Sequence, residues 1–160
     1  MPQLITREAA LAQIGKEISP GECLVCHLLK KESARVLQRE AYATVLLSSY
    51  PRFWGQVMLC VNRHVESYSE LKDEEWEELS HFSLEYARRL ETQLQPVRVY
   101  IAALGAPQPL PHTCPHLHVN LLPVYDAQLK PSEALTWTNG LYAGSEEEWQ
   151  ELFQKLSAEF

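Results

Sequence analysis

The sequence lacks an excess of positive charge and any long apolar run. Its 160 residues include 14 Lys and Arg against 21 Asp and Glu, for a formal net charge of −7. A general nucleic-acid binder needs a basic face, so this balance argues against one, although a local pocket can still oppose the overall field. No apolar run approaches the roughly 18 residues of a membrane-spanning helix, so no membrane association is expected.

The chain also lacks internal repeats, low-complexity tracts, and an N-terminal basic stretch followed by an apolar one. We therefore expect a cytoplasmic protein. Its 4 cysteines are then reduced thiols or metal ligands and not a disulfide framework. The length and the 46% of hydrophobic residues predict a single domain, residues 1–160, with an adequate core.

Two of the cysteines, Cys23 and Cys26, form a C-x2-C pair that can hold two thiolates around one tetrahedral ion. Zinc sites are commonly closed by histidine nitrogens, and His64 and His116 would complete a Cys2His2 set. Such a closed zinc would be structural, whereas a catalytic zinc would keep an open position. The alternatives are buried inert thiols or a redox dithiol, although a redox pair should follow a strand and this pair follows a Ser-Pro-Gly turn.

The segment from Pro115 to Pro123 alternates polar and apolar residues. His116, His118 and Asn120 recur with a period of two, so a strand would turn all three to one face, about 7 Å apart. Two imidazoles at that spacing can serve one site without competing for one position. The alternative is a half-exposed strand that happens to be rich in histidine.

Five short segments have the pattern of strands, and three have that of helices. The expected strands span residues 34–39, 42–48, 56–61, 97–104 and 116–122, and the expected helices span 6–18, about 74–94 and 145 to about 158. Thr6, Asp73 and Ser145 are the expected helix caps. This order predicts an α+β fold, with a mostly antiparallel five-stranded sheet, a long helix before the last two strands, and a C-terminal helix.

These blocks resemble the histidine triad superfamily of nucleotide hydrolases and transferases. The resemblance rests on Cys23-x-x-Cys26, the Gly55–His64 strand and turn, and the His116–Pro123 segment. It covers a core of about residues 20–125 and leaves 126–160 as a C-terminal extension. It implies a small-molecule nucleotide as ligand and a homodimer.

The zinc-bearing branch of this superfamily looks like the galactose-1-phosphate uridylyltransferase arrangement. There the first histidine of the motif completes a site with two cysteines and one upstream histidine. The matching residues here are His116, Cys23, Cys26 and His64. The resemblance therefore also implies a structural Zn²⁺.

The motif of the superfamily is His-φ-His-φ-His-φ-φ, where φ is an apolar residue. Its middle histidine attacks the α-phosphorus of a nucleotide and forms a covalent nucleotidyl-histidine, and that position is His118. The third position holds Asn120, where the uridylyltransferases carry Gln. An amide can donate a hydrogen bond to a phosphate oxygen but cannot titrate near neutral pH.

Three further residues are assigned by the same resemblance. Thr113 stands where a phosphate-contacting Ser or Thr is usual, and Ser48 stands where many members place an Asp against the ribose. His112 stands where many members have Gln, and is either an acid for the leaving group or a loop residue without a catalytic role. Gln56 replaces a histidine that often follows the same glycine.

Taken with these residues, the resemblance implies a nucleotidyl hydrolase or transferase that acts on dinucleoside polyphosphates or related nucleotides. Two alternatives stay open: a non-enzymatic nucleotide-binding protein on the same fold, and a zinc-dependent hydrolase.

Overall fold

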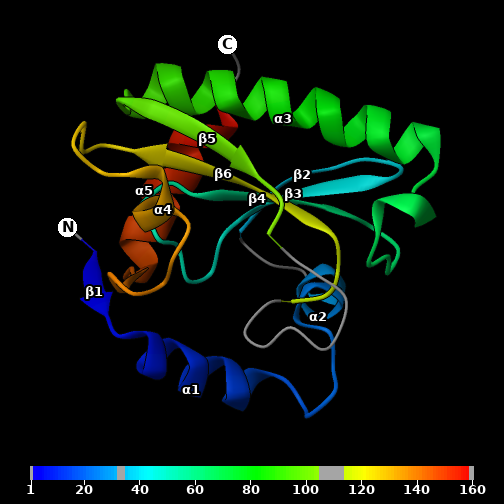
Figure 1. The fold of residues 1–160 in the computed structure, drawn as a ribbon, viewed down its shortest axis with the longest axis horizontal. Coiled ribbons are helices and arrows are strands. Elements are labelled where there is room, and N and C mark those ends of the chain that lie inside the picture. Colours follow the sequence, from blue (N-terminus) through cyan, green and yellow to red (C-terminus); the bar gives the residue numbers. More distant parts are fainter. Residues whose placement is uncertain (1, 32–34, 105–113, 159–160) are drawn as a thin grey trace.

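The computed structural model describes residues 2–31, 35–104 and 114–158. Its main sheet has the strand order β2-β3-β4-β6-β5, and every neighbouring pair is antiparallel (Figure 1). The strands are β2 (Val36–Arg39), β3 (Ala43–Leu47), β4 (Val57–Val61), β5 (Arg98–Ala102) and β6 (His118–Val124). The predicted α+β class and the five-stranded antiparallel sheet are confirmed.

Helices lie on both sides of this sheet. The long helix α3 (Asp73–Leu94) runs along one side, and α1 (Arg7–Glu17) and α2 (Leu24–Lys30) lie on the other (Figure 1). The C-terminal helix α5 (Glu146–Ser157) packs against α3 and β2. The remaining elements are β1 (Gln3–Ile5), η1 (Tyr68–Glu70), α4 (Pro131–Ala134) and β7 (Leu141–Ala143).

Side chains alternate along β6, so successive residues face opposite sides of the sheet, and each side has its own apolar cluster. Val119 and Leu121 belong to the large core that α3 and α5 close. A smaller cluster on the other face joins Leu46 and Cys60 of the sheet to Val25 of α2. Because side chains alternate along a strand, His118 and Asn120 face away from α3, toward the side of α2.

Two expectations about local structure need correction. The N-cap of α3 is Lys72 and not Asp73, because the Glu75 carboxylate accepts a hydrogen bond from the Lys72 backbone N–H (2.9 Å) and starts the helix earlier. Strand β6 begins at His118 and not at residue 116, since the Leu117 N–H donates to the Val65 carbonyl (2.7 Å) and leaves the ladder with β4.

Two further parts of the structure were not predicted. Helix α2 covers the second cysteine of the C-x2-C pair, and Cys23 is its N-cap. Strands β1 and β7 form a second, two-stranded antiparallel sheet that pairs residues 3–5 with residues 141–143. Both elements are too short for a hydrophobic period to show in the sequence. No helix of the described residues has the length and apolar character needed to cross a membrane.

A buried carboxylate ties the segment after β4 to the start of α3. Glu75 is 3% exposed and accepts from Arg63 Nε (2.5 Å) and Nη2 (3.0 Å), while Arg63 itself is half-exposed. The Arg63 guanidinium is the main cause that holds the pKa of Glu75 below its ordinary value. This pair positions the residue that follows Arg63, His64.

We expect Glu75→Gln to lower the free energy of unfolding at pH 7 by about 1–3 kcal/mol, because a buried acceptor of a charged donor is replaced. A carboxyl whose folded pKa is depressed stabilises the fold above its unfolded pKa, and loses that contribution as the pH falls through the folded value. The difference between wild type and variant should therefore shrink below about pH 4. Urea titrations at both pH values measure it, and a difference independent of pH would contradict the assignment.

Candidate functional site

Four side chains converge where α2, the segment after β4 and the segment before β6 meet. One ligand atom from each of Cys23, Cys26, His64 and His116 lies within 4.8 Å of the other three. Cys26 Sγ is 3.4 Å from both His64 Nδ1 and His116 Nδ1, and Cys23 Sγ is 3.5 Å from His116 Nδ1. Zinc bonds of about 2.3 Å to sulfur and about 2.0–2.1 Å to nitrogen at tetrahedral angles place S and N about 3.6 Å apart. The spacing therefore fits one tetrahedral ion.

The two histidines are oriented so that both turn Nδ1 toward the sulfurs. His116 is fully buried, and its Nε2 lies 3.0 Å from the Val61 carbonyl, which can only accept. His64 Nε2 lies 3.0 Å from a carboxylate oxygen of Glu66. Both Nε2 atoms then carry the hydrogen, and both Nδ1 atoms keep a free lone pair. An acceptor on the far nitrogen is what orients metal-binding histidines.

The pKa values of the two thiols shift in opposite directions. Burial raises the pKa of Cys26, and the neighbouring Cys23 sulfur adds to this effect. Burial also acts to raise the pKa of Cys23, but hydrogen bonds from the Cys26 backbone and from neighbouring side chains outweigh it and leave this pKa lowered. Cys23 is therefore the readier thiolate, and a bound cation would favour the deprotonated form of both.

His118 lies two residues beyond this cluster and faces a cavity. Its Nδ1 is 2.7 Å from the carbonyl of His116, so Nδ1 donates and Nε2 keeps the lone pair. Burial lowers the pKa of His118, and the Arg52 charge adds to this effect. The lowered pKa favours the neutral imidazole, in which Nε2 has a free lone pair.

A chain of amide hydrogen bonds orients Asn120. The backbone N–H of Arg52 donates to Gln56 Oε1 (2.9 Å), so Gln56 Nε2 must be the donor to Asn120 Oδ1 (3.1 Å). Gln56 follows Gly55, whose φ of +97° permits the turn into β4, and a Cβ there would meet Leu94. The Asn120 amide group is thereby left with its NH2 as the donor available to a ligand.

The cavity has a volume of about 580 Å³, which is within the range of small-molecule sites. Its polar end includes Ser48, Arg52, Gln56, His118 and Asn120. Its apolar wall comes from α1, α2 and the segment after α4, through Leu11, Ile14, Leu24, Leu28, Leu135 and Trp137. No carboxylate is among the described residues that line it.

No protein-family model and no curated protein matches the sequence. Solved structures do match it. A Zn-bound histidine triad family protein from Mycobacterium smegmatis, with 15% identity and a TM-score of 0.60, covers 85% of this chain and 94% of its own. The diadenosine triphosphate hydrolase of Plasmodium falciparum, in complex with cyclomarin A, has 15% identity and a TM-score of 0.58 over 77% of this chain and 74% of its own.

A third match is a uridylyltransferase with 22% identity and a TM-score of 0.64, over 94% of this chain and 49% of its own. The chain has the histidine triad fold. The three sequence blocks on which the resemblance rests therefore lie on α2, β4 and β6, or directly beside them, in this fold.

On the histidine triad fold, the structure brings most of the sequence candidates together. His118, Asn120 and Ser48 line the cavity, and the four metal candidates form one cluster beside it. His116 does not share the strand face of His118, because it precedes β6 and is buried in the cluster. His112 and Thr113 lie outside the described residues, so their roles stay predictions.

Two features of this site were not predicted. Arg52 lies between the expected strands 42–48 and 56–61, where no site residue was expected, although a cation between Pro51 and Phe53 could have indicated a positively charged group there. The wall formed by α1 and residues 135–138 lies outside the core that the resemblance covers. The pairing of β1 with β7 helps to bring these distant segments to the same place.

Proposed function

We propose that this protein is a nucleotidyl hydrolase or transferase that acts at the α-phosphate of dinucleoside polyphosphates or related nucleotides. The observation that carries the proposal is the state of His118, whose Nδ1 is held by the His116 carbonyl while the residue lines the cavity. The likeness of the fold to a diadenosine triphosphate hydrolase and to a uridylyltransferase supports the class of substrate.

In the proposed reaction, the Nε2 lone pair of His118 attacks the α-phosphorus. The new P–N bond forms as the bond from phosphorus to the leaving oxygen breaks, and the leaving group takes that electron pair. Water or another acceptor then attacks the phosphorus, breaks the P–N bond and restores the imidazole. Two displacements replace one harder one, and in this proposal the Asn120 NH2, whose oxygen already accepts from Gln56, donates to an equatorial oxygen.

The test is intact-protein mass spectrometry after brief mixing with a diadenosine polyphosphate, quenched without acid, on wild type and His118→Ala. An adenylyl increment on wild type alone supports the proposal. The same experiment with a uridylyl donor separates the two nucleotide classes. Nucleotide binding with neither adduct nor product would instead favour the non-enzymatic binding protein, for which the untitratable Asn120 in the third position is the motive.

We further propose that Cys23, Cys26, His64 and His116 bind a structural zinc ion. The near-tetrahedral spacing and the anchored Nε2 atoms of both histidines support it, as does the likeness to a Zn-bound protein of this fold. With all four positions taken by protein, the ion would hold α2 against the segment before β6, and would not act as the Lewis acid of the reaction.

We also propose that the protein is a homodimer that pairs through β5. This strand is at the edge of the sheet, and Val97 and Ile101 beside and within it are 59% and 54% exposed. An open apolar edge is a template for pairing with another chain. Sedimentation velocity should find a dimer for wild type and a monomer for Ile101→Lys; a monomer in both cases would exclude this interface.

A further inference from the structure

Arg52 is held in an environment that is costly for a cation. Its Nε and Nη2 atoms are buried, and neither has a hydrogen-bond partner among the described residues. Burial is the one cause that shifts its pKa, and it lowers it, because no described carboxylate opposes the loss of solvent. An arginine without a partner in such a place destabilises the ligand-free fold.

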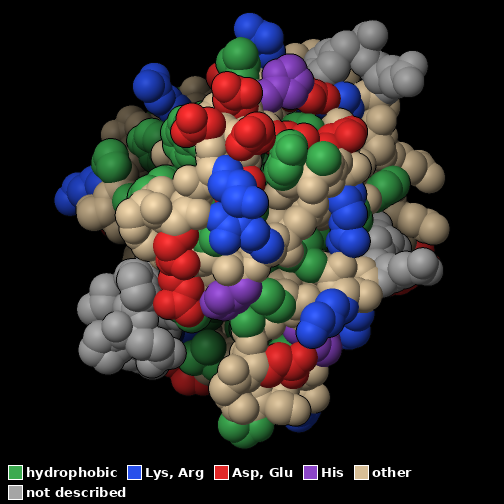
Figure 2. Space-filling view, turned by 90° about the vertical axis from the view of Figure 1, so that its right-hand side faces the viewer, with side chains coloured by type: hydrophobic (Ala, Val, Ile, Leu, Met, Phe, Trp, Pro, Cys, Tyr) green, Lys and Arg blue, Asp and Glu red, His purple; other side chains and the backbone are tan. Residues whose placement is uncertain are grey.

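The surroundings show what could compensate for this cost. Arg52 lines the same cavity as His118 and Asn120. Arg7 of α1 is a second cation on the cavity wall, and no described lining residue is acidic. By contrast, acidic side chains form a band across the outer face that includes the start of α3 (Figure 2). The described lining of the cavity is thus positively charged, whereas the molecule as a whole has a net negative charge.

We propose that Arg52 is the anion-binding residue of the cavity, and that its unpaired N–H groups bind a phosphate oxygen of the ligand whose phosphorus faces His118. This assignment rests on the proposed function for the identity of the ligand. Guanidinium N–H groups match two oxygens of one phosphate, and such charge-assisted hydrogen bonds are the strong ones. The unpaired Arg52 destabilises the ligand-free protein, and hydrogen bonds to the bound phosphate offset that cost.

The proposal predicts opposite effects of one substitution on stability and on binding. Arg52→Met keeps an unbranched side chain in place of the aliphatic part of arginine, and it leaves the backbone N–H that orients Gln56 in place. We expect it to raise the melting temperature of the ligand-free protein, because an unpaired buried charge is removed. We expect its affinity for inorganic phosphate to fall by about 10- to 100-fold, and that of Arg52→Lys to fall less.

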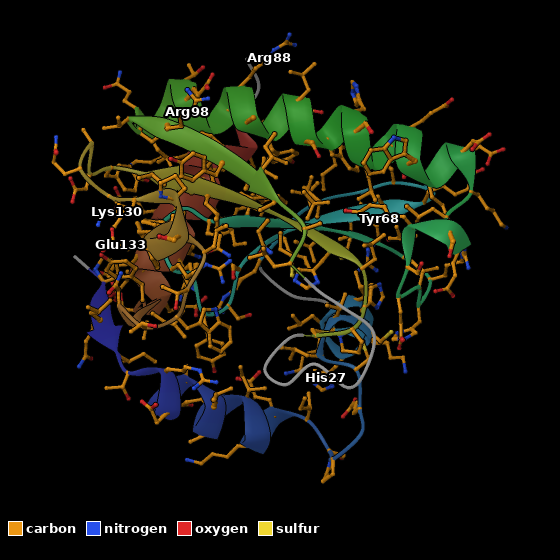
Figure 3. The ribbon with its side chains drawn as sticks, viewed as in Figure 1. His27, Tyr68, Arg88, Arg98, Lys130 and Glu133 are labelled. Atoms are coloured by element: carbon orange, nitrogen blue, oxygen red, sulfur yellow. The ribbon has the colours of Figure 1, made fainter. Side chains whose placement is uncertain are left out.

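The probe is inorganic phosphate, followed by calorimetry and by thermal unfolding, with potassium chloride at equal ionic strength to correct for screening. Arg98→Gln is the matched control: Arg98, labelled in Figure 3, is exposed at the start of β5 and does not line the cavity, so the substitution should leave both readings unchanged. Phosphate that raises the melting temperature of wild type and Arg98→Gln, but not of Arg52→Met, supports the proposal.

Unchanged phosphate affinity in Arg52→Met would overturn the assignment, and so would a wild type that does not bind phosphate. A lowered melting temperature of Arg52→Met with unchanged affinity would make Arg52 a purely structural residue. The adduct on His118 is measured separately. Phosphate binding that depends on Arg52, without any nucleotidyl adduct, would refute nucleotidyl transfer and leave the anion-binding role of Arg52 standing.

Discussion

Replacement of His118 by alanine is expected to lower kcat for the breakdown of a diadenosine polyphosphate by at least about 1,000-fold, because the reaction loses its nucleophile. Binding of the nucleotide should change by less than about tenfold, since the groups placed to contact phosphate and the apolar wall are unaltered. The free energy of unfolding should fall by only about 1 kcal/mol, the worth of the hydrogen bond to the His116 carbonyl.

Steady-state kinetics and calorimetry on the same preparations measure these two effects. His81→Ala is the matched control, because the His81 side chain is 75% exposed on α3 and takes no part in the cavity. Its kinetic constants should equal those of wild type. Turnover by His118→Ala at a rate near that of wild type would remove His118 as the nucleophile and bring the zinc-dependent hydrolase forward.

Loss of one ligand from the cysteine and histidine cluster is expected to have the largest effect on stability. Cys26→Ser should abolish zinc binding and lower the free energy of unfolding by about 3 kcal/mol or more, out of the roughly 5–15 kcal/mol that a domain has. Binding of a structural ion is folding free energy, because the four ligands meet only in the folded chain. They span residues 23 to 116, which is most of the core.

Metal analysis and thermal unfolding of purified protein, with and without a chelator, measure this effect. Cys114→Ser is the matched control: Cys114 is half-buried near the cluster but is not one of its four members. It should retain zinc and respond to the chelator as wild type does. A chelator that stops turnover while the melting temperature stays unchanged would show that the metal is catalytic and not structural.

The fold could be predicted from the sequence where a long helix or an alternating strand shows a clear hydrophobic pattern. The apolar face of α3, with Leu79, Phe82 and Leu90, and the alternation of Val119 and Leu121 along β6 are both confirmed as the two sides of one core. The four metal candidates were also predictable, because cysteine and histidine at these spacings have few other uses.

What the sequence did not predict depends on contacts between distant residues. The N-cap of α3 moved to Lys72 because of the Glu75 side chain, and β6 lost its first residues to a hydrogen bond with Val65. Neither competition shows in a local pattern. The unpaired state of Arg52 is likewise a property of its surroundings, since an arginine in a loop ordinarily reaches solvent.

The pairing of β1 with β7 has a consequence for the order in which the protein is made. Strand β1 is synthesised before every strand of the main sheet, yet its partner, residues 141–143, is synthesised after all of them. The sheet from β2 to β6 has all its strands by residue 124, before residues 135–138 of the cavity wall and before β7, the partner of β1, are synthesised. The nascent chain should therefore form its main sheet before the cavity can retain a ligand, and α5 closes the large core last.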